Sequence, residues 1–175
     1  TASYFFSRGN VGFAYFGDAL RVNSVDGNEL AARESRKDNY LSCNISAERL
    51  SKIIKNSSKK PTAVYLTSPD YLGNVVDIMS ISKICHENDI LLAIDNAHGA
   101  YLRFLTPSQH PMDLGADICC DSAHKTLPVL TGGAYLHLSE SLAFVEGYVK
   151  NALALFGSTS PSYLTLASLD CCNAG

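Results

Sequence analysis

From residue 46 onward, short apolar runs alternate with stretches in which apolar residues recur every three or four positions. Ser46 and Asp77 each supply an N-cap side chain in front of such a stretch. The apolar positions at helical spacing are Leu50, Ile53 and Ile54 after the first cap, and Ile78, Ile81, Ile84 and Cys85 after the second. This pattern predicts two helices that each bury one face.

The apolar runs themselves predict strands, at residues 62–67, 90–95, 117–121 and 133–138. The second run, Ile90-Leu-Leu-Ala-Ile-Asp95, is apolar until its last residue, which is typical of a strand buried on both faces. Strands that alternate with helices predict an α/β fold with a mostly parallel sheet flanked by helices. Residues 140–156 are predicted to form a further helix.

Composition and charge narrow the function classes. The 175 residues include 14 Lys and Arg against 17 Asp and Glu, a net charge of −3, so nothing favours nucleic-acid binding. The longest apolar runs, such as residues 152–156, fall far short of the roughly twenty residues of a membrane span. The N-terminus carries no secretory signal pattern, and we expect a cytoplasmic chain with reduced cysteines.

The cysteines and three of the histidines predict no metal site. The sequence contains no C-x-x-C spacing, and Cys119 and Cys120 fall within a predicted strand, where we expect both to pack as small buried side chains. His86, His110 and His137 lack ligand spacing and are expected to pack or to face solvent.

Chemistry is expected where the strands end, because ligands of open α/β sheets bind beyond the carboxyl ends of the strands. A lysine beside a histidine at such an end can be desolvated, which lowers the pKa of its amine and favours Schiff-base formation; Lys125 follows His124 in this way. Asp95 ends a neighbouring strand and is suited to keep a ring nitrogen protonated. Those two groups are the ones that pyridoxal phosphate requires, and Ser122 and His124, pointing the same way on extended backbone, are suitable phosphate donors.

Three segments carry a family resemblance. In chain order they are Thr67-Ser-Pro-Asp-Tyr-Leu-Gly73, Asp95-Asn-Ala-His-Gly-Ala100 and Ser122-Ala-His-Lys-Thr-Leu-Pro128. With them the chain resembles the Orn/Lys/Arg decarboxylase family, which consists of fold-type-I pyridoxal-phosphate enzymes acting on basic amino acids. The resemblance extends from about residue 41 to about residue 170 and implies the large domain of that fold, in incomplete form.

The resemblance also implies roles for individual residues. Lys125 would form the Schiff base with pyridoxal phosphate, Asp95 would pair with the pyridine nitrogen, and His98 would lie close to the cofactor as a second catalytic group. Ser122 and His124 would contact the phosphate or steady the lysine. Ser158 would reach the cofactor phosphate of the neighbouring subunit, since the family's cofactor sites lie at the interface of a homodimer.

The implied reaction is decarboxylation of arginine, lysine or ornithine to a polyamine precursor. The alternatives are another pyridoxal-phosphate reaction, such as transamination or an aldolase-like cleavage, and an inactive truncated fragment. Residues 1–45 match the family poorly and lack its phosphate-binding turn, residues 46–156 match the cofactor-binding core, and residues 157–175 would begin the connection to a C-terminal domain that is missing. We therefore expect an excerpt of the large domain.

Overall fold

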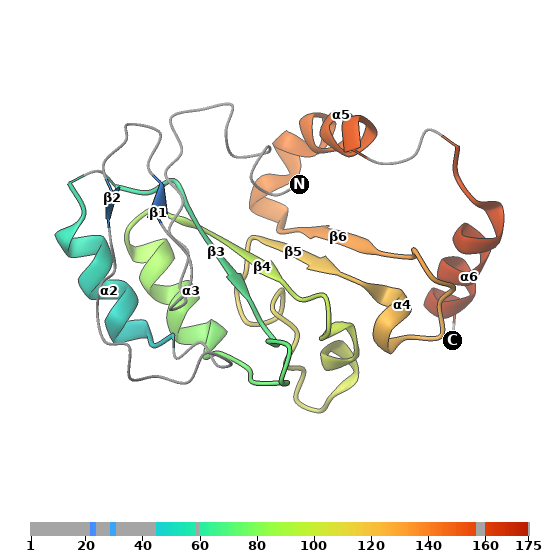
Figure 1. The fold of residues 1–175 in the computed structure, drawn as a ribbon, viewed down its shortest axis with the longest axis horizontal. Coiled ribbons are helices and arrows are strands. Elements are labelled where there is room, and N and C mark those ends of the chain that lie inside the picture. The colour runs from blue at the N-terminus through green and yellow to red at the C-terminus, as the bar shows by residue number, and fades with distance from the viewer. Residues whose placement is uncertain (1–21, 24–28, 31–44, 59, 157–159, 175) are drawn as a thin grey trace.

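The computed structural model describes residues 22–23, 29–30, 45–58, 60–156 and 160–174. Its main feature is a four-stranded sheet in the order β3-β4-β5-β6 (Figure 1). The strands are β3 (Ala63–Thr67), β4 (Leu91–Asp95), β5 (Ile118–Asp121) and β6 (Tyr135–Leu138). A separate antiparallel pair joins β1 (Val22–Asn23) to β2 (Glu29–Leu30). The rest of residues 1–44, where the family's phosphate-binding turn would be expected, lies outside the described residues.

The sheet is mostly parallel, as predicted. β3 pairs with β4 and β4 pairs with β5 in parallel, with Thr67 opposite Asp95 and Asp95 opposite Cys120. Only the edge strand β6 is antiparallel, because a short helix and a loop lead to it instead of a long crossover. The carboxyl ends of β3, β4 and β5 therefore meet at one edge of the sheet.

Two helices cover one face of the sheet, and both begin at the predicted caps. In α2 (Ala47–Asn56) the Ser46 hydroxyl accepts a hydrogen bond from the Arg49 amide, and in α3 (Ile78–Glu87) the Asp77 carboxylate accepts one from the Ser80 amide. The core between these helices and the sheet comprises Leu50, Val64, Leu66, Ile78, Ile81, Cys85, Ile90, Leu92, Ile94, Ala116 and Cys119. We call this side of the sheet the helix face.

The opposite side of the sheet, which we call the open face, carries the alternate residues of each strand. Asp95 on β4 and its register partner Cys120 on β5 both lie there. Cys119 is fully buried on the helix face, whereas Cys120 is exposed, so the prediction that both cysteines are buried is wrong for Cys120. The reason is that consecutive residues of a strand point to opposite faces.

The C-terminal part departs from the single predicted helix. Residues Glu140–Val145 form the 3₁₀ helix η2, and the α-helix α5 runs from Glu146 to Phe156. The buried side chain of Leu142 lies within this tighter turn, whose backbone amide at Leu142 donates to the Ser139 carbonyl. Helix α6 (Tyr163–Ala174) follows at the end of the described chain. Within the described ranges, the helices are too short or too polar to cross a lipid bilayer.

Candidate active site

The three predicted motif segments meet at the carboxyl edge of the sheet. The amide of Ser68, just after β3, donates to the carbonyl of Asp95, and the amide of Asn96, just after β4, donates to the carbonyl of Cys120. The end of β5 leads at once into the short helix α4 (Ala123–Thr126), which carries Lys125. Backbone hydrogen bonds thus connect the ends of three neighbouring strands into one platform.

The amine of Lys125 is paired with an imidazole. Its Nζ lies 3.2 Å from Nε2 of His98, in the turn that follows β4. The edge of the half-buried His98 ring also meets the ring of Tyr71, with 6.0 Å between ring centroids. Lys125 itself is exposed, so the predicted desolvation of this lysine is wrong for the described chain. Its position on a one-turn helix beyond the strand end leaves the side chain accessible to solvent.

The carboxylate of Asp95 is held by two donors. The hydroxyl of Tyr65, on β3, donates to Oδ2 at 3.0 Å, and the amide of Ala97 donates to Oδ1 at 3.2 Å. Asp95 is half-buried on the open face. Tyr65 was not singled out from the sequence, although it alternates with the buried residues Val64 and Leu66 and so had to face the same side as Asp95.

Cys120 lies on the open face opposite Asp95, its register partner on β4. Desolvation of the thiol raises the pKa of Cys120, the negative charges of Asp95 and Asp121 raise it further, and the positive charge of Lys125 lowers it. The expectation that one ring reaches both Asp95 and Lys125 stays a prediction.

The other predicted residues lie nearby in different settings. Ser122 is the N-cap residue of α4, and its hydroxyl makes no capping hydrogen bond. His124 lies inside α4, so the expected extended backbone that would align it with Ser122 is wrong. Instead, its ring Nδ1 donates to the Gly133 carbonyl at 2.9 Å and its amide donates to the same oxygen at 3.2 Å, which holds α4 against the following loop. The phosphate contacts stay predictions, and Ser158 lies outside the described residues.

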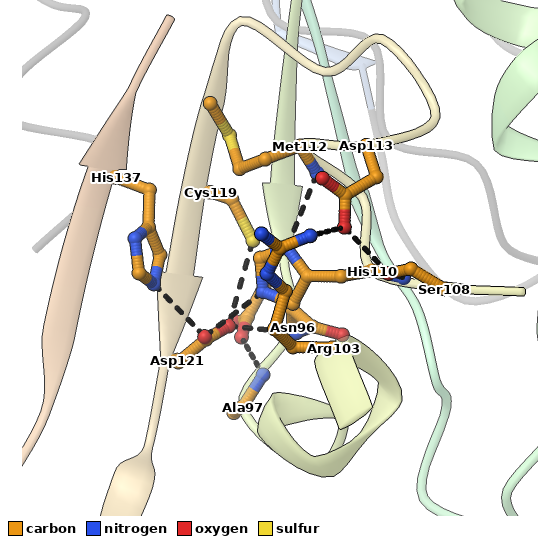
Figure 2. Close-up of polar contacts among 11 residues, drawn as sticks. Asn96, Ala97, Arg103, Ser108, His110, Met112, Asp113, Cys119, Asp121 and His137 are labelled. Carbon is orange, nitrogen blue, oxygen red and sulfur yellow. Dashed lines mark hydrogen bonds and ion pairs between the residues drawn. The ribbon is translucent and has the colours of Figure 1, made fainter. Parts of the chain in front are cut away.

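A group of residues on the helix face was missed. Figure 2 shows His137 and His110 directed at the carboxylate of Asp121, the last residue of β5. Both Nε2 atoms lie near the same Oδ2, at 3.0 Å for His110 and 2.9 Å for His137. The expectation that these histidines merely pack or face solvent is wrong, and His86 likewise contacts the carboxylate of Asp117 at 3.0 Å. Sequence spacing hid the group because the histidines lie 11 and 16 positions from Asp121.

Comparison with known proteins decides the family. A profile described as Orn/Lys/Arg decarboxylase, major domain, matches residues 36–174. The chain belongs to the Orn/Lys/Arg decarboxylase family. The match includes all three strand ends that form the platform, which confirms the resemblance inferred from the motifs.

The matches to curated relatives cover only part of the length of those relatives. The chain is 41% identical over 112 residues to the uncharacterized protein YaaO of Bacillus subtilis, a match covering 62% of the chain and 23% of that protein. It is 36% identical over 104 residues to an arginine decarboxylase of the same organism, covering 59% of the chain and 21% of that enzyme. The chain thus spans less than a quarter of the length of these relatives.

Solved structures share the fold. The complex of SepCysS with the N-terminal domain of SepCysE matches with a TM-score of 0.51 at 22% identity, over 61% of this chain and 29% of that one. CalE6, a methionine gamma lyase from Micromonospora echinospora, matches with a TM-score of 0.51 at 22% identity, over 75% of this chain and 32% of that one. These matches confirm a fold-type-I architecture for the decarboxylase-family chain, here as a partial domain.

Proposed function

We propose that the chain provides the cofactor-binding core of a pyridoxal-phosphate-dependent decarboxylase that acts on a basic amino acid. The observation that carries the proposal is the pairing of Lys125 Nζ with His98 Nε2, at the edge of the sheet where β4 ends in Asp95. The groups fit the cofactor in kind: an accessible primary amine, and a carboxylate at the next strand end. The family match over residues 36–174 supports the same assignment.

Each group then has a chemical task. Bound pyridoxal phosphate supplies an electron sink for the carbanion that remains when carbon dioxide leaves. Lys125 is proposed to hold the cofactor through a Schiff base, and His98 to accept the proton of its ammonium form, which frees the amine as a nucleophile. Asp95 is proposed to keep a proton on the ring nitrogen, with Tyr65 fixing the carboxylate through its hydrogen bond to Oδ2.

The phosphate contacts and the assembly belong to the same proposal. Ser122 and His124, at the start of α4, are proposed to lie nearest the phosphate or to steady Lys125. Ser158 is proposed to reach the phosphate of the neighbouring subunit in a homodimer. The similarity to an arginine decarboxylase over 104 residues supports a basic substrate, with arginine, lysine and ornithine as candidates. The cytoplasm is the proposed compartment.

Cofactor titration of the purified chain tests the binding step. We expect pyridoxal phosphate to produce a Schiff-base absorbance band that borohydride removes. Lys125→Ala should abolish the band, whereas Lys83→Ala should leave it unchanged, because Lys83 is an exposed lysine of α3 paired with Glu87. Identical spectra for the wild type and Lys125→Ala would contradict the proposal.

Product analysis tests the reaction. Incubation with arginine, lysine or ornithine should release carbon dioxide and the corresponding amine. A keto acid would identify a transaminase and an aldehyde an aldolase-like lyase, which are the alternatives that share the cofactor. Cofactor binding without turnover would identify a chain that is inactive on its own.

A further inference from the structure

Strand β5 has a buried aspartate at each end. Asp117 directly precedes the strand and is 6% exposed, and Asp121 closes it and is 3% exposed. Asp121 is separated from Lys125 by three residues, whereas Asp117 lies at the opposite end of the strand. An isolated buried carboxylate is costly, so each must be satisfied by its neighbours.

Asp121 is satisfied by side chains from three other segments. Its Oδ2 accepts from His110 in the loop before β5 and from His137 on β6, while its Oδ1 accepts from the Asn96 side chain at 2.7 Å. The Cys119 thiol lies 3.5 Å from Oδ1 as a weaker donor. We refer to Asn96, His110, Asp121 and His137 as the Asp121 cluster (Figure 2).

The contacts of the Asp121 cluster are those of a hydrogen-bonded network. The nitrogen and oxygen atoms of His110, Asp121 and His137 lie within 4.8 Å of one another, a spacing that also suits a metal ion. However, the Met112 amide donates to Nδ1 of His110 at 3.3 Å, which assigns the ring proton to Nε2. That Nε2–H points to Asp121, and a nitrogen that carries a proton has no lone pair for a cation.

The Asp121 cluster joins the two strand ends that carry the candidate active site. Asn96 directly follows Asp95, so its side-chain bond to Asp121 ties the end of β4 to the end of β5 from the helix face. The Asn96 amide makes a second connection, to the Cys120 carbonyl at 2.9 Å. Asp95 ends β4 and Lys125 follows the end of β5, so this double connection joins the backbone segments that carry the two residues.

We propose that Asp121 is a positioning residue, which sets the separation of Asp95 and Lys125 by holding Asn96, His110 and His137 at the end of β5. The proposal rests on the proposed function for its consequence, because the separation matters only if one ring must reach both groups. It does not require Asp121 to touch cofactor or substrate. Asp121→Asn should therefore alter the site more than it alters the fold.

Asp117→Asn is the matched control. Asp117 accepts from His86 Nε2 at 3.0 Å and from the Leu92 amide at 2.7 Å, so it is also a buried carboxylate with a histidine donor. Each substitution removes one buried charge next to or at an end of β5, and each should lower the melting temperature of the full chain. Only Asp121 lies at the carboxyl end of β5, which leads to Lys125.

Two readouts separate positioning from stability. The first is the dissociation constant for pyridoxal phosphate, which should rise about tenfold or more in Asp121→Asn, since displacement by about 1 Å can cost about a hundredfold in a positioned reaction. The second needs no cofactor: acetic anhydride acetylates the Lys125 amine, and peptide mass spectrometry measures the extent of acetylation as a function of pH. We call this curve the Lys125 labelling profile. We expect Asp121→Asn to shift this profile and Asp117→Asn to leave it at the wild-type position.

A second pair of variants guards against a failure to fold. The His137 side chain is 36% exposed and that of Asp121 is 5% exposed, so we expect replacement of His137 to cost less stability. His137→Leu removes a donor to Asp121 and should shift the Lys125 profile in the same direction, while His137→Gln keeps an N–H donor and should restore it.

Three outcomes would overturn the positioning role. These are equal effects of Asp121→Asn and Asp117→Asn on both readouts, an unchanged Lys125 profile in Asp121→Asn and His137→Leu, and a Zn²⁺-dependent rise in melting temperature that Asp121→Asn abolishes. If wild-type chain fails to bind pyridoxal phosphate, the proposed function fails, and the acetylation profile alone still decides the positioning role.

Discussion

The Nζ of Lys125 and the Nε2 of His98 lie 3.2 Å apart, although 27 positions separate them in the chain. One belongs to a one-turn helix after β5 and the other to the turn after β4. The contact exists because parallel strands bring their carboxyl ends to one edge, where the residues that follow each strand become neighbours. An imidazole beside the amine supplies a proton acceptor at the point where the proposed Schiff base would form.

Removal of this acceptor should slow cofactor attachment. In His98→Leu, Lys125 loses its imidazole partner, and we expect the rate of Schiff-base formation to fall by about a hundredfold, the usual contribution of a positioned base. Stopped-flow absorbance measures the rate. Tyr71→Phe is the control, because it keeps the aromatic ring against His98 and should react at the wild-type rate. Equal rates for His98→Leu and the wild type would contradict a role for His98.

The hydroxyl of Tyr65 should matter through Asp95. Tyr65→Phe removes the donor to Asp95 Oδ2, and we expect a loss of about 1 kcal/mol in the free energy of unfolding, together with weaker cofactor binding. Tyr135→Phe is the matched control, since that hydroxyl donates to the Leu169 carbonyl in α6. Titration with pyridoxal phosphate compares the two. Equal cofactor affinities in both variants would remove Tyr65 from the site.

Gly99 should resist substitution because of close packing beneath the His98 turn. A Cβ at Gly99 would collide with Oδ1 of Asn96 and with Cδ of Pro69. Gly99→Ala should therefore lower the free energy of unfolding by about 1–3 kcal/mol, as measured in urea. Gly147→Ala is the control, because no atom lies within 4 Å of an added Cβ there. Equal free energies of unfolding for Gly99→Ala and Gly147→Ala would contradict close packing at Gly99.

Asp121 should make stability depend on acid pH. Burial by itself would raise the pKa of Asp121, but hydrogen bonds from His110, His137 and Asn96 outweigh burial and hold the pKa below its ordinary value. A carboxyl with a lowered pKa in the folded state stabilises fully above its unfolded pKa of about 3.9 and loses this contribution as the pH falls further. We therefore expect the stability difference between the wild type and Asp121→Asn to shrink as the pH falls below about 4. Urea unfolding across a pH series measures it, and a constant difference would contradict the ionised cluster.

Much of the core and the three motif segments could be predicted from local pattern. The N-caps Ser46 and Asp77 begin helices as predicted, because a side-chain acceptor at that position satisfies free backbone amides of the first turn. The apolar runs form strands because they bury side chains under α2 and α3. Asp95 stands at the end of β4 and Lys125 follows the end of β5, but the register that places Asp95 opposite Cys120 is not contained in local pattern.

The remaining features depend on contacts between distant segments. Cys119 lies opposite His137 only because β6 returns antiparallel, so the bond between His137 and Asp121 has no sequence motif. The exposure of Lys125 follows from the short length of α4, and the orientation of His124 follows from the Gly133 carbonyl. Asp121 closes an otherwise apolar strand, which was a sequence signal for the Asp121 cluster. This signal did not indicate which residues would contact the carboxylate.

Peptide mapping after borohydride reduction tests the proposed function most directly. The chain is mixed with pyridoxal phosphate, reduced, digested and analysed by mass spectrometry to locate the pyridoxyl group. We expect the pyridoxyl group on the peptide that contains Lys125. In His98→Leu, this peptide should carry little pyridoxyl group after a short reaction time. A pyridoxyl group spread over surface lysines, with Lys125 labelled no more than Lys83, would contradict the assignment of this edge of the sheet as the cofactor site.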